Sequence, residues 1–164
     1  YGSLLKAFAI VNEKIPNSEL LIIGRGHLKN RLEKQAIKLG ISSSVSIDSG
    51  MPFDKLAEKF RNADLVVYPS YYEGQGLIPL EAMASGTPVA TVDHGPLPEM
   101  VDDSVGGLFT MANIDSMSSV ILSLLSDKKG LEVRGNAGRQ RVLENYTYGK
   151  NAERFSQIYS NLAN

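Results

Sequence analysis

The sequence has no cysteine among its 164 residues. This absence excludes a disulfide framework and any metal site built from thiolates, and it agrees with a reducing compartment. No apolar run reaches the roughly 18 residues that a membrane-spanning helix needs. No signal-peptide pattern opens the chain either. We therefore expect a cytoplasmic protein.

The chain also lacks an excess of charge of either sign. Its 17 basic and 18 acidic residues are scattered without long runs of one sign. This pattern gives no electrostatic reason to bind nucleic acid or anionic lipid, so neither is an expected partner. The chain starts at Tyr1 without a methionine and already inside a helical pattern, from which we expect it to be part of a longer protein.

The apolar residues alternate between short continuous runs, typical of buried parallel strands, and runs with helical spacing. The predicted strands are residues 19–24, 45–48, 63–68, 89–92 and 106–110, and the predicted helices are residues 1–15, 28–39, 55–61, 77–84, 97–101, 117–125 and 129–145, with a last helix containing Ala152, Phe155, Tyr159 and Leu162. We expect the methionine and aromatic residues of the last helices to lie in the core. Alternating strands and helices predict an α/β fold, a Rossmann-like parallel sheet with helices on both faces.

The most informative stretch runs from residue 71 to residue 89. Gly74 and Gly76 indicate a turn with unusual backbone angles, and Pro79 is tolerated in the first turn of a helix. A helix is therefore predicted from Leu77, with an apolar stripe of Leu77, Leu80 and Ala84, up to a glycine cap at Gly86. The free N–H groups at such a helix start suit a phosphate or sugar oxygen.

Two carboxylates, Glu73 and Glu81, lie eight positions apart across this helix start. We expect both to face one crevice at different depths. A lone pair of this kind is more often a helix cap and a solvated residue, because helix starts favour acids. The continuation through Gly86 and Pro88 into the strand at 89–92 favours a ligand site, as in other α/β folds.

A second glycine-rich turn, Gly24-Arg25-Gly26, follows the strand at residues 19–24. Ligands gather at such strand ends. The third glycine of the dinucleotide fingerprint and its acidic residue about 20 positions on are absent, which argues against NAD. Arg25 could contact a phosphate, although an arginine in such a loop is more often solvated.

The pattern Glu-Gly-x-Gly-Leu-x-x-Leu-Glu-Ala-Met-Ala-x-Gly-x-Pro-Val at residues 73–89 closely resembles the signature of the retaining glycosyltransferases with the GT-B fold, called group 1 or family 4. Residues 22–26 and 95–101 also resemble the corresponding segments of this family. The resemblance covers essentially the whole chain, as the C-terminal, donor-binding half of such an enzyme.

The resemblance implies a nucleotide-sugar donor, a UDP- or GDP-sugar, and no cofactor. By position, Glu81 would bind the ribose hydroxyls, and Glu73 would be the catalytic residue, in contact with hydroxyls of the donor sugar. The resemblance further assigns substrate binding to the backbone of Gly74, Gln75, Gly76 and Leu77, near the sugar and the diphosphate, and to Met51, Gly24 and Arg25 around the base and phosphates. Gln75 stands where an aromatic or small residue is common in the family. No Asp-x-Asp occurs, so we expect no metal at the diphosphate.

The family's acceptor-binding N-terminal domain and its diphosphate-binding arginine and lysine would lie outside this chain. The acceptor is therefore an unidentified glycan, lipid or small molecule, and the resemblance allows peripheral membrane association through that other domain. The 164 residues alone are expected to be inactive.

Other functions of the same fold stay open at this stage. A nucleotide-sugar epimerase and a non-catalytic nucleotide-sugar-binding module are the nearest alternatives. A glycan phosphorylase would require a pyridoxal-phosphate lysine motif, which the sequence does not show. An oxidoreductase is the weakest alternative.

The resemblance also makes a prediction about the sheet. In the family a strand precedes the first helix and lies centrally in the order 3-2-1-4-5-6. That strand is absent from this sequence, so we expect either a gap beside the strand at residues 20–23 or a segment of another chain that fills it. Direct pairing of this strand with the strand at residues 65–68 would contradict the prediction.

Overall fold

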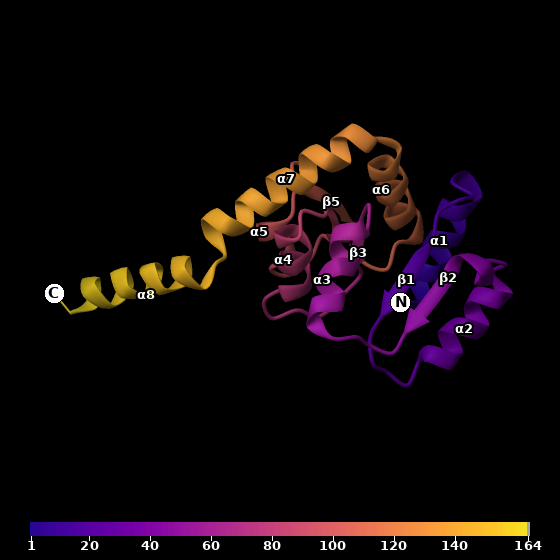
Figure 1. The fold of residues 1–164 in the computed structure, drawn as a ribbon, viewed down its shortest axis with the longest axis horizontal. Helices are drawn as coiled ribbons and strands as arrows, with labels where there is room; N and C mark the ends of the chain where they lie inside the picture. The colour runs from indigo at the N-terminus through magenta and orange to yellow at the C-terminus, as the bar shows by residue number, and fades with distance from the viewer. Residues whose placement is uncertain (164) are drawn as a thin grey trace.

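The computed structural model describes residues 1–163, which form parallel strands and covering helices (Figure 1). The elements in chain order are α1 (Gly2–Lys14), β1 (Leu20–Ile23), α2 (Lys29–Lys38), a short 3-10 helix (Ser42–Ser44), β2 (Val45–Asp48), α3 (Phe53–Asn62), β3 (Val66–Tyr68), α4 (Leu77–Ala84), β4 (Val89–Val92), α5 (Leu97–Met100), β5 (Gly106–Phe109), α6 (Ile114–Ser126), α7 (Lys128–Asn145) and α8 (Tyr148–Leu162). The α/β class and the order of elements agree with the expectation from the sequence.

The strands form two parallel sheets. One contains β1 and β2, with Leu20 opposite Val45, and the other has the order β3-β4-β5, with Val66 opposite Val89. Among residues 1–163, β1 and β3 share no ladder of hydrogen bonds. The predicted gap beside β1 is therefore confirmed, since the order β2-β1-gap-β3-β4-β5 is the Rossmann order with its central strand left out.

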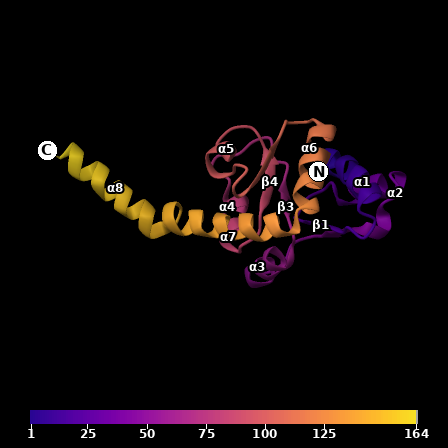
Figure 2. The ribbon, with the colours of Figure 1, turned by 90° about the horizontal axis from the view of Figure 1, so that it is seen from above.

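Two helix contacts hold the two sheets and their covering helices together. α1 packs against α6, and α4 packs against α7. β4 is buried along its whole length, because it lies between two strands and has helices on both faces. In Figure 2, α7 runs along one side of the second sheet, and α3 packs against α4.

The predicted apolar stripe of α4 is correct only in part, because Leu80 and Ala84 pack against the core but Leu77 does not. Its buried residues are Pro79, Ala82 and Met83, whereas Leu77 is 57% exposed. The reason is the contact with α7, where Gly138 leaves room for the side chain of Met83. A helix packed on both a sheet and another helix buries more than one stripe.

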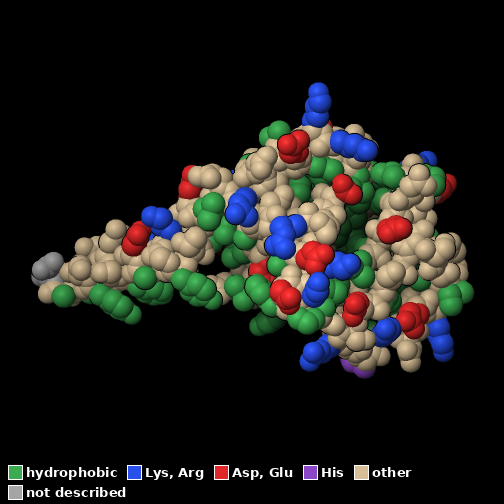
Figure 3. Space-filling model, viewed as in Figure 1, with side chains coloured by type: hydrophobic (Ala, Val, Ile, Leu, Met, Phe, Trp, Pro, Cys, Tyr) green, Lys and Arg blue, Asp and Glu red, His purple; other side chains and the backbone are tan. Residues whose placement is uncertain are grey.

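The expected core position of the aromatic residues in the last helix is also wrong. Met117 of α6 is fully buried, as expected, but Phe155 and Tyr159 of α8 are 58% and 66% exposed. α8 extends away from the sheets, and apolar side chains lie along it (Figures 1 and 3). The rings of Phe155 and Tyr159 stack on each other, with centroids 6.3 Å apart. The helical spacing of these residues correctly indicated one apolar face, but not a neighbour that covers it.

No helix in the described part of the chain is both long enough and apolar enough to cross a membrane.

Candidate functional site

The central loop connects β3 to α4 at the carboxyl end of the second sheet. Gly76 caps α4 with a left-handed backbone, φ +69° and ψ +49°, and it is buried. A Cβ atom at this position would lie 2.6 Å from Met100 Cε and 2.9 Å from Leu97 Cδ2. The glycine is therefore required both by its backbone angles and by the close packing of α5 against the loop.

Replacing Gly76 by alanine is expected to lower the free energy of unfolding by about 2 kcal/mol, because left-handed backbone strain and overpacking add up. Gly74→Ala is the matched control, since Gly74 has no positive φ and a Cβ atom added there would have no other atom within 4 Å. That variant should change stability by less than about 0.5 kcal/mol. Urea denaturation of both variants provides the measurement, and equal effects would contradict the role assigned to Gly76.

Glu73 is half-buried, and one of its carboxylate oxygens, Oε1, accepts a hydrogen bond from the hydroxyl of Tyr68. This bond is the largest cause that lowers the pKa of Glu73, with further contributions from the Ser70 hydroxyl and the Gly76 N–H. A hydrogen bond to a carboxylate favours its charged form. Glu73 is therefore ionised at neutral pH.

Glu81 has a different environment. It is half-buried in α4, and burial raises the pKa of its carboxyl group. No donor among residues 1–163 bonds to this carboxylate. Partly desolvated and without a partner, it has both oxygens available to accept hydrogen bonds from a ligand.

A pocket of about 120 Å³ lies beside Glu73. One wall is the loop after β3, and the other is the loop between β4 and α5; the lining residues are Ser70, Tyr71, Tyr72, Glu73, His94, Gly95, Pro96 and Leu97. The two loops therefore face each other across this pocket. The pocket is small beside the roughly 300 Å³ of typical ligand sites, so it would hold only part of a ligand. Glu81 does not line it, and a single crevice shared by both carboxylates stays a prediction.

The other predicted site residues lie at the carboxyl ends of β1 and β2. The N–H of Gly24 donates to the carbonyl of Asp48 at 3.0 Å, which ties the two strand ends together. The Arg25 side chain lies over Gly50, where a Cβ atom would be 3.2 Å from Arg25 Nε. Arg25 therefore lies next to the turn that contains Met51. These residues and the Glu73 loop belong to different sheets, on either side of the gap.

A larger depression, of about 390 Å³, lies over the first sheet. It contains none of the predicted site residues, and its lining residues are Leu21, Lys29, Ser46, Ile47, Asp48 and Ser49.

Two residues beside Glu73 were not assigned to the site from the sequence. The sequence places Tyr68 only in a strand. Its partly buried hydroxyl nevertheless finds a hydrogen-bond partner in the loop that follows, as tyrosine hydroxyls usually do when they are removed from water. The sequence around His94 indicates only a loop residue, yet His94 lines the pocket. Its position only became informative once the two loops were seen to face each other.

The family model described as "Glycosyl transferases group 1" matches residues 1–141. The chain belongs to this family, which confirms the resemblance found in the sequence.

Among curated proteins, the chain is similar to MMP alpha-(1->4)-mannosyltransferase of Mycolicibacterium hassiacum, with 34% identity over 143 residues, 86% of this chain and 35% of that protein. Among solved structures, it is similar to sucrose-phosphate synthase of Thermosynechococcus elongatus, with a TM-score of 0.86 and 28% identity over 98% of this chain and 41% of that one. TarM of S. aureus, solved in complex with Fondaparinux, alpha-GlcNAc-glycerol and UDP, gives a TM-score of 0.85 and 26% identity over 96% of this chain and 32% of that one.

The chain therefore spans less than half of the length of each of these relatives. The similarity to solved structures extends over almost all of this chain, and it confirms the Rossmann-like fold of the C-terminal part of a GT-B glycosyltransferase.

Proposed function

We propose that this chain is the C-terminal, donor-binding domain of a longer retaining glycosyltransferase, which transfers a sugar from a UDP- or GDP-sugar to an acceptor. The observation that carries the proposal is the pair of carboxylates at the start of α4. Glu73 is ionised and hydrogen-bonded beside a pocket, whereas Glu81 is half-buried and has no donor. Membership of the group 1 family supports the reaction class.

Each carboxylate suits a different part of a nucleotide sugar. The two free oxygens of Glu81 can accept charge-assisted hydrogen bonds from the vicinal hydroxyls of a ribose. Such bonds also offset the cost of holding a partly desolvated carboxylate. Glu73 lines a pocket large enough for part of a ligand and would bind hydroxyls of the donor sugar.

The reaction places negative charge on the leaving diphosphate and positive character on the sugar ring, as in other glycosyl-transfer reactions. Donors aimed at the phosphate oxygens stabilise that transition state. The first turn of α4 offers backbone N–H groups and the positive end of the helix dipole, at Leu77 and Ile78. The N–H of Gly76 already donates to the Glu73 carboxylate and lowers its pKa, so it would act on the donor only through Glu73.

The base of the nucleotide would lie across the gap, near the turn of Met51, with Arg25 close to a phosphate. A donor extended in this way needs more surface than the pocket beside Glu73 provides. The structure of TarM, a similar protein, contains UDP, which supports a nucleotide diphosphate as a ligand, and the name of the mycobacterial relative supports hexosyl transfer. We propose that no metal and no cofactor take part and that the anomeric configuration is retained.

A thermal-shift panel of UDP, GDP, ADP and their sugars on the full-length protein tests this proposal, because a ligand that binds the native state raises its melting temperature. We expect stabilisation by UDP or GDP and by the matching sugar nucleotide. Glu81→Ala should weaken nucleotide binding by roughly 10-fold to 100-fold, since it removes two charge-assisted hydrogen bonds.

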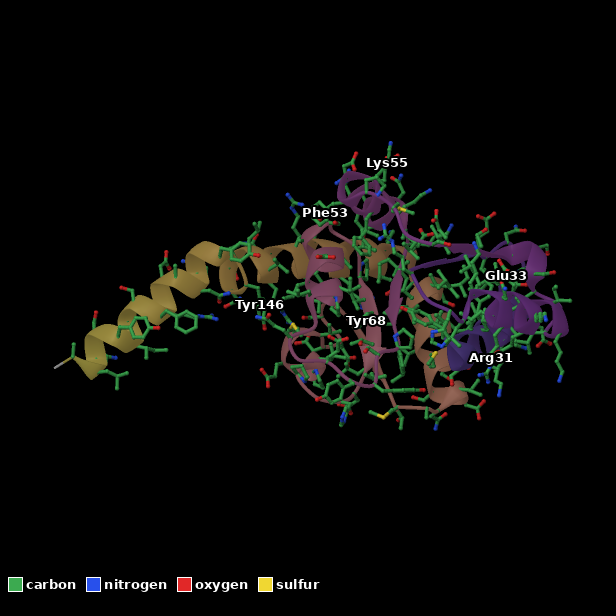
Figure 4. The ribbon with its side chains drawn as sticks, turned by 90° about the horizontal axis from the view of Figure 1, so that it is seen from below. Arg31, Glu33, Phe53, Lys55, Tyr68 and Tyr146 are labelled. Atoms are coloured by element: carbon green, nitrogen blue, oxygen red, sulfur yellow. The ribbon has the colours of Figure 1, made fainter. Side chains whose placement is uncertain are left out.

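Glu33→Ala is the control, because Glu33 is an exposed residue of α2, distant from α4 in sequence and structure (Figure 4). Unchanged binding by Glu81→Ala would show that Glu81 is not the ribose ligand. Binding of the donor without any transfer to an acceptor or to water would favour a non-catalytic nucleotide-sugar-binding module instead.

A further inference from the structure

Tyr68 connects the second sheet to the loop of Glu73. It is the last residue of β3 and pairs with Thr91 of β4 in the ladder of strands (Figure 4). The hydroxyl of Thr91, which is fully buried, also donates to the backbone carbonyl of Tyr68 at 2.9 Å. The backbone that carries the Tyr68 side chain is therefore fixed by two neighbouring interactions in the core of the sheet.

The loop after Tyr68 is attached to the rest of the chain mainly at its end, where Gly76 packs against Leu97 and Met100 of α5. Tyr71 and Tyr72 are exposed, and the Ser70 hydroxyl lies near the carbonyl of Tyr72, at 3.3 Å, and near the Glu73 carboxylate, so it links parts of the same loop. The hydrogen bond from Tyr68 to Glu73 spans this loop and joins its functional side chain to the sheet. A side chain held by a rigid element is oriented more accurately than one held by its loop alone.

The protonation states favour a fixed direction for this bond. Burial is the main cause that raises the pKa of Tyr68 to about 12, and the bond to Glu73 adds to it. The same bond lowers the pKa of Glu73. Tyr68 therefore keeps its proton over the whole neutral range and is always the donor. An ionised carboxylate has about four lone-pair sites on its two oxygens, so Glu73 can accept the bond from Tyr68 and still accept hydrogen bonds from a ligand.

We propose that Tyr68 is a positioning residue, which orients the Glu73 carboxylate toward the hydroxyls of the donor sugar. This inference rests on the proposed function, because it requires Glu73 to bind the donor. It assigns to Tyr68 a role that acts through Glu73 and involves no contact between the tyrosine and the reacting atoms.

Tyr68→Phe in the full-length protein tests this role, because it removes the hydroxyl and keeps the ring. We expect kcat to fall about 10-fold, as for the loss of one hydrogen bond to a charged group, with a smaller change in KM for the donor. Without the bond the pKa of Glu73 rises, and its ionised form is then lost at a higher pH as the pH is lowered. The acidic limb of the pH profile of kcat should therefore move to higher pH.

Tyr148→Phe is the matched control, since the Tyr148 side chain is 96% exposed at the start of α8. It should leave kcat and the pH profile unchanged. The double variant Tyr68→Phe with Glu73→Gln should be no slower than Glu73→Gln alone, because Tyr68 acts through Glu73. An unmoved pH profile in Tyr68→Phe, or additive losses in the double variant, would overturn the proposal.

A measurement on the unmodified protein avoids any effect of the substitution on folding. The ¹³Cζ NMR signal of Tyr68 should shift as Glu73 takes up its proton at acidic pH, and an unshifted signal would show that the two groups are not bonded. The proposed function fails separately, if Glu73→Gln itself keeps full activity. If Glu73→Gln is inactive but Tyr68→Phe behaves like the control, only the role of Tyr68 is refuted.

Discussion

Replacing Glu73 by glutamine in the full-length protein is expected to lower kcat by about 100-fold or more, with little change in KM for the nucleotide sugar. The amide has the shape of the carboxylate but no charge, and it offers one acceptor oxygen in place of two. That oxygen would still be held by Tyr68. The hydroxyls of the sugar would then face the NH2 group of the amide, which donates hydrogen bonds. This group carries no negative charge to stabilise the positive character that develops on the sugar ring in the transition state.

The size of this effect follows from the environment of Glu73. Preorganised groups in a partly enclosed site contribute about 10²-fold to 10³-fold to kcat when they act on developing charge. Glu73 fits this description because its pKa is lowered by three separate hydrogen bonds and it lines the pocket between two loops. Transfer of a labelled sugar from UDP- and GDP-sugars gives the measurement.

Glu33→Gln is the control for this experiment, because Glu33 is exposed on α2 and should show unchanged kinetics. A result in which KM rises and kcat stays constant would assign Glu73 to ground-state binding alone. Wild-type kinetics in Glu73→Gln would remove Glu73 from the site altogether.

Gly135→Ala is expected to destabilise the protein by about 3 kcal/mol or more, which is a large fraction of the stability of a domain of this size. α7 crosses the end of α4 at Gly135, and an added Cβ would collide with the backbone carbonyl of Gly86 and lie 3.5 Å from Pro88 Cδ. Overpacking against a backbone atom is costly because no side-chain rotation can relieve it.

The backbone around Gly86 cannot easily move away. Gly86 has a left-handed φ of +85°, and the next residue, Thr87, is buried. The Thr87 N–H donates to the carbonyl of Ala82 at 3.1 Å, and its hydroxyl donates to the carbonyl of Phe60 at 2.5 Å. A shift of this turn would break bonds to both α4 and α3.

Gly149→Ala is the matched control, because Gly149 is also in a helix but has only Thr147 Oγ1 at 3.9 Å from its Cβ position. Alanine is the better helix former, so this variant should be neutral or more stable by up to about 1 kcal/mol. Thermal and urea unfolding of the two variants compare them directly. Similar stabilities would show that α7 is not closely packed against the turn at Gly86.

Much of the architecture could be predicted from local sequence signals. β2 and β4 occur at the predicted residues, and α4 begins at Leu77. The signals for these elements, apolar runs and glycines, lie within the elements or directly beside them in the chain. The gap in the sheet was predictable from the order of strands in the family. The buried face of α4 was not, because it depends on the glycines of α7, more than 50 residues away.

The candidate site, too, could be predicted from the sequence only in part. The loop with Glu73 and Gly76 was found from its glycines and carboxylates, but the bond from Tyr68 depends on side-chain positions that spacing does not reveal. The different environments of Glu73 and Glu81 likewise arise from burial and from partners, so they could not be predicted from the two residue types. The apolar face of α8 was visible in the sequence, whereas its exposure was not.

The space between β1 and β3 determines the distance between the residues proposed to bind the nucleotide and those proposed to bind the sugar. Neighbouring strands are about 4.8 Å apart, so a strand inserted there would hold β1 and β3 roughly 10 Å from each other. Arg25 and Met51 follow the first sheet, and Glu73 and Glu81 follow the second. In the proposed complex, the inserted strand would therefore act as a spacer. It would determine how long a donor must be to contact the residues that follow both sheets.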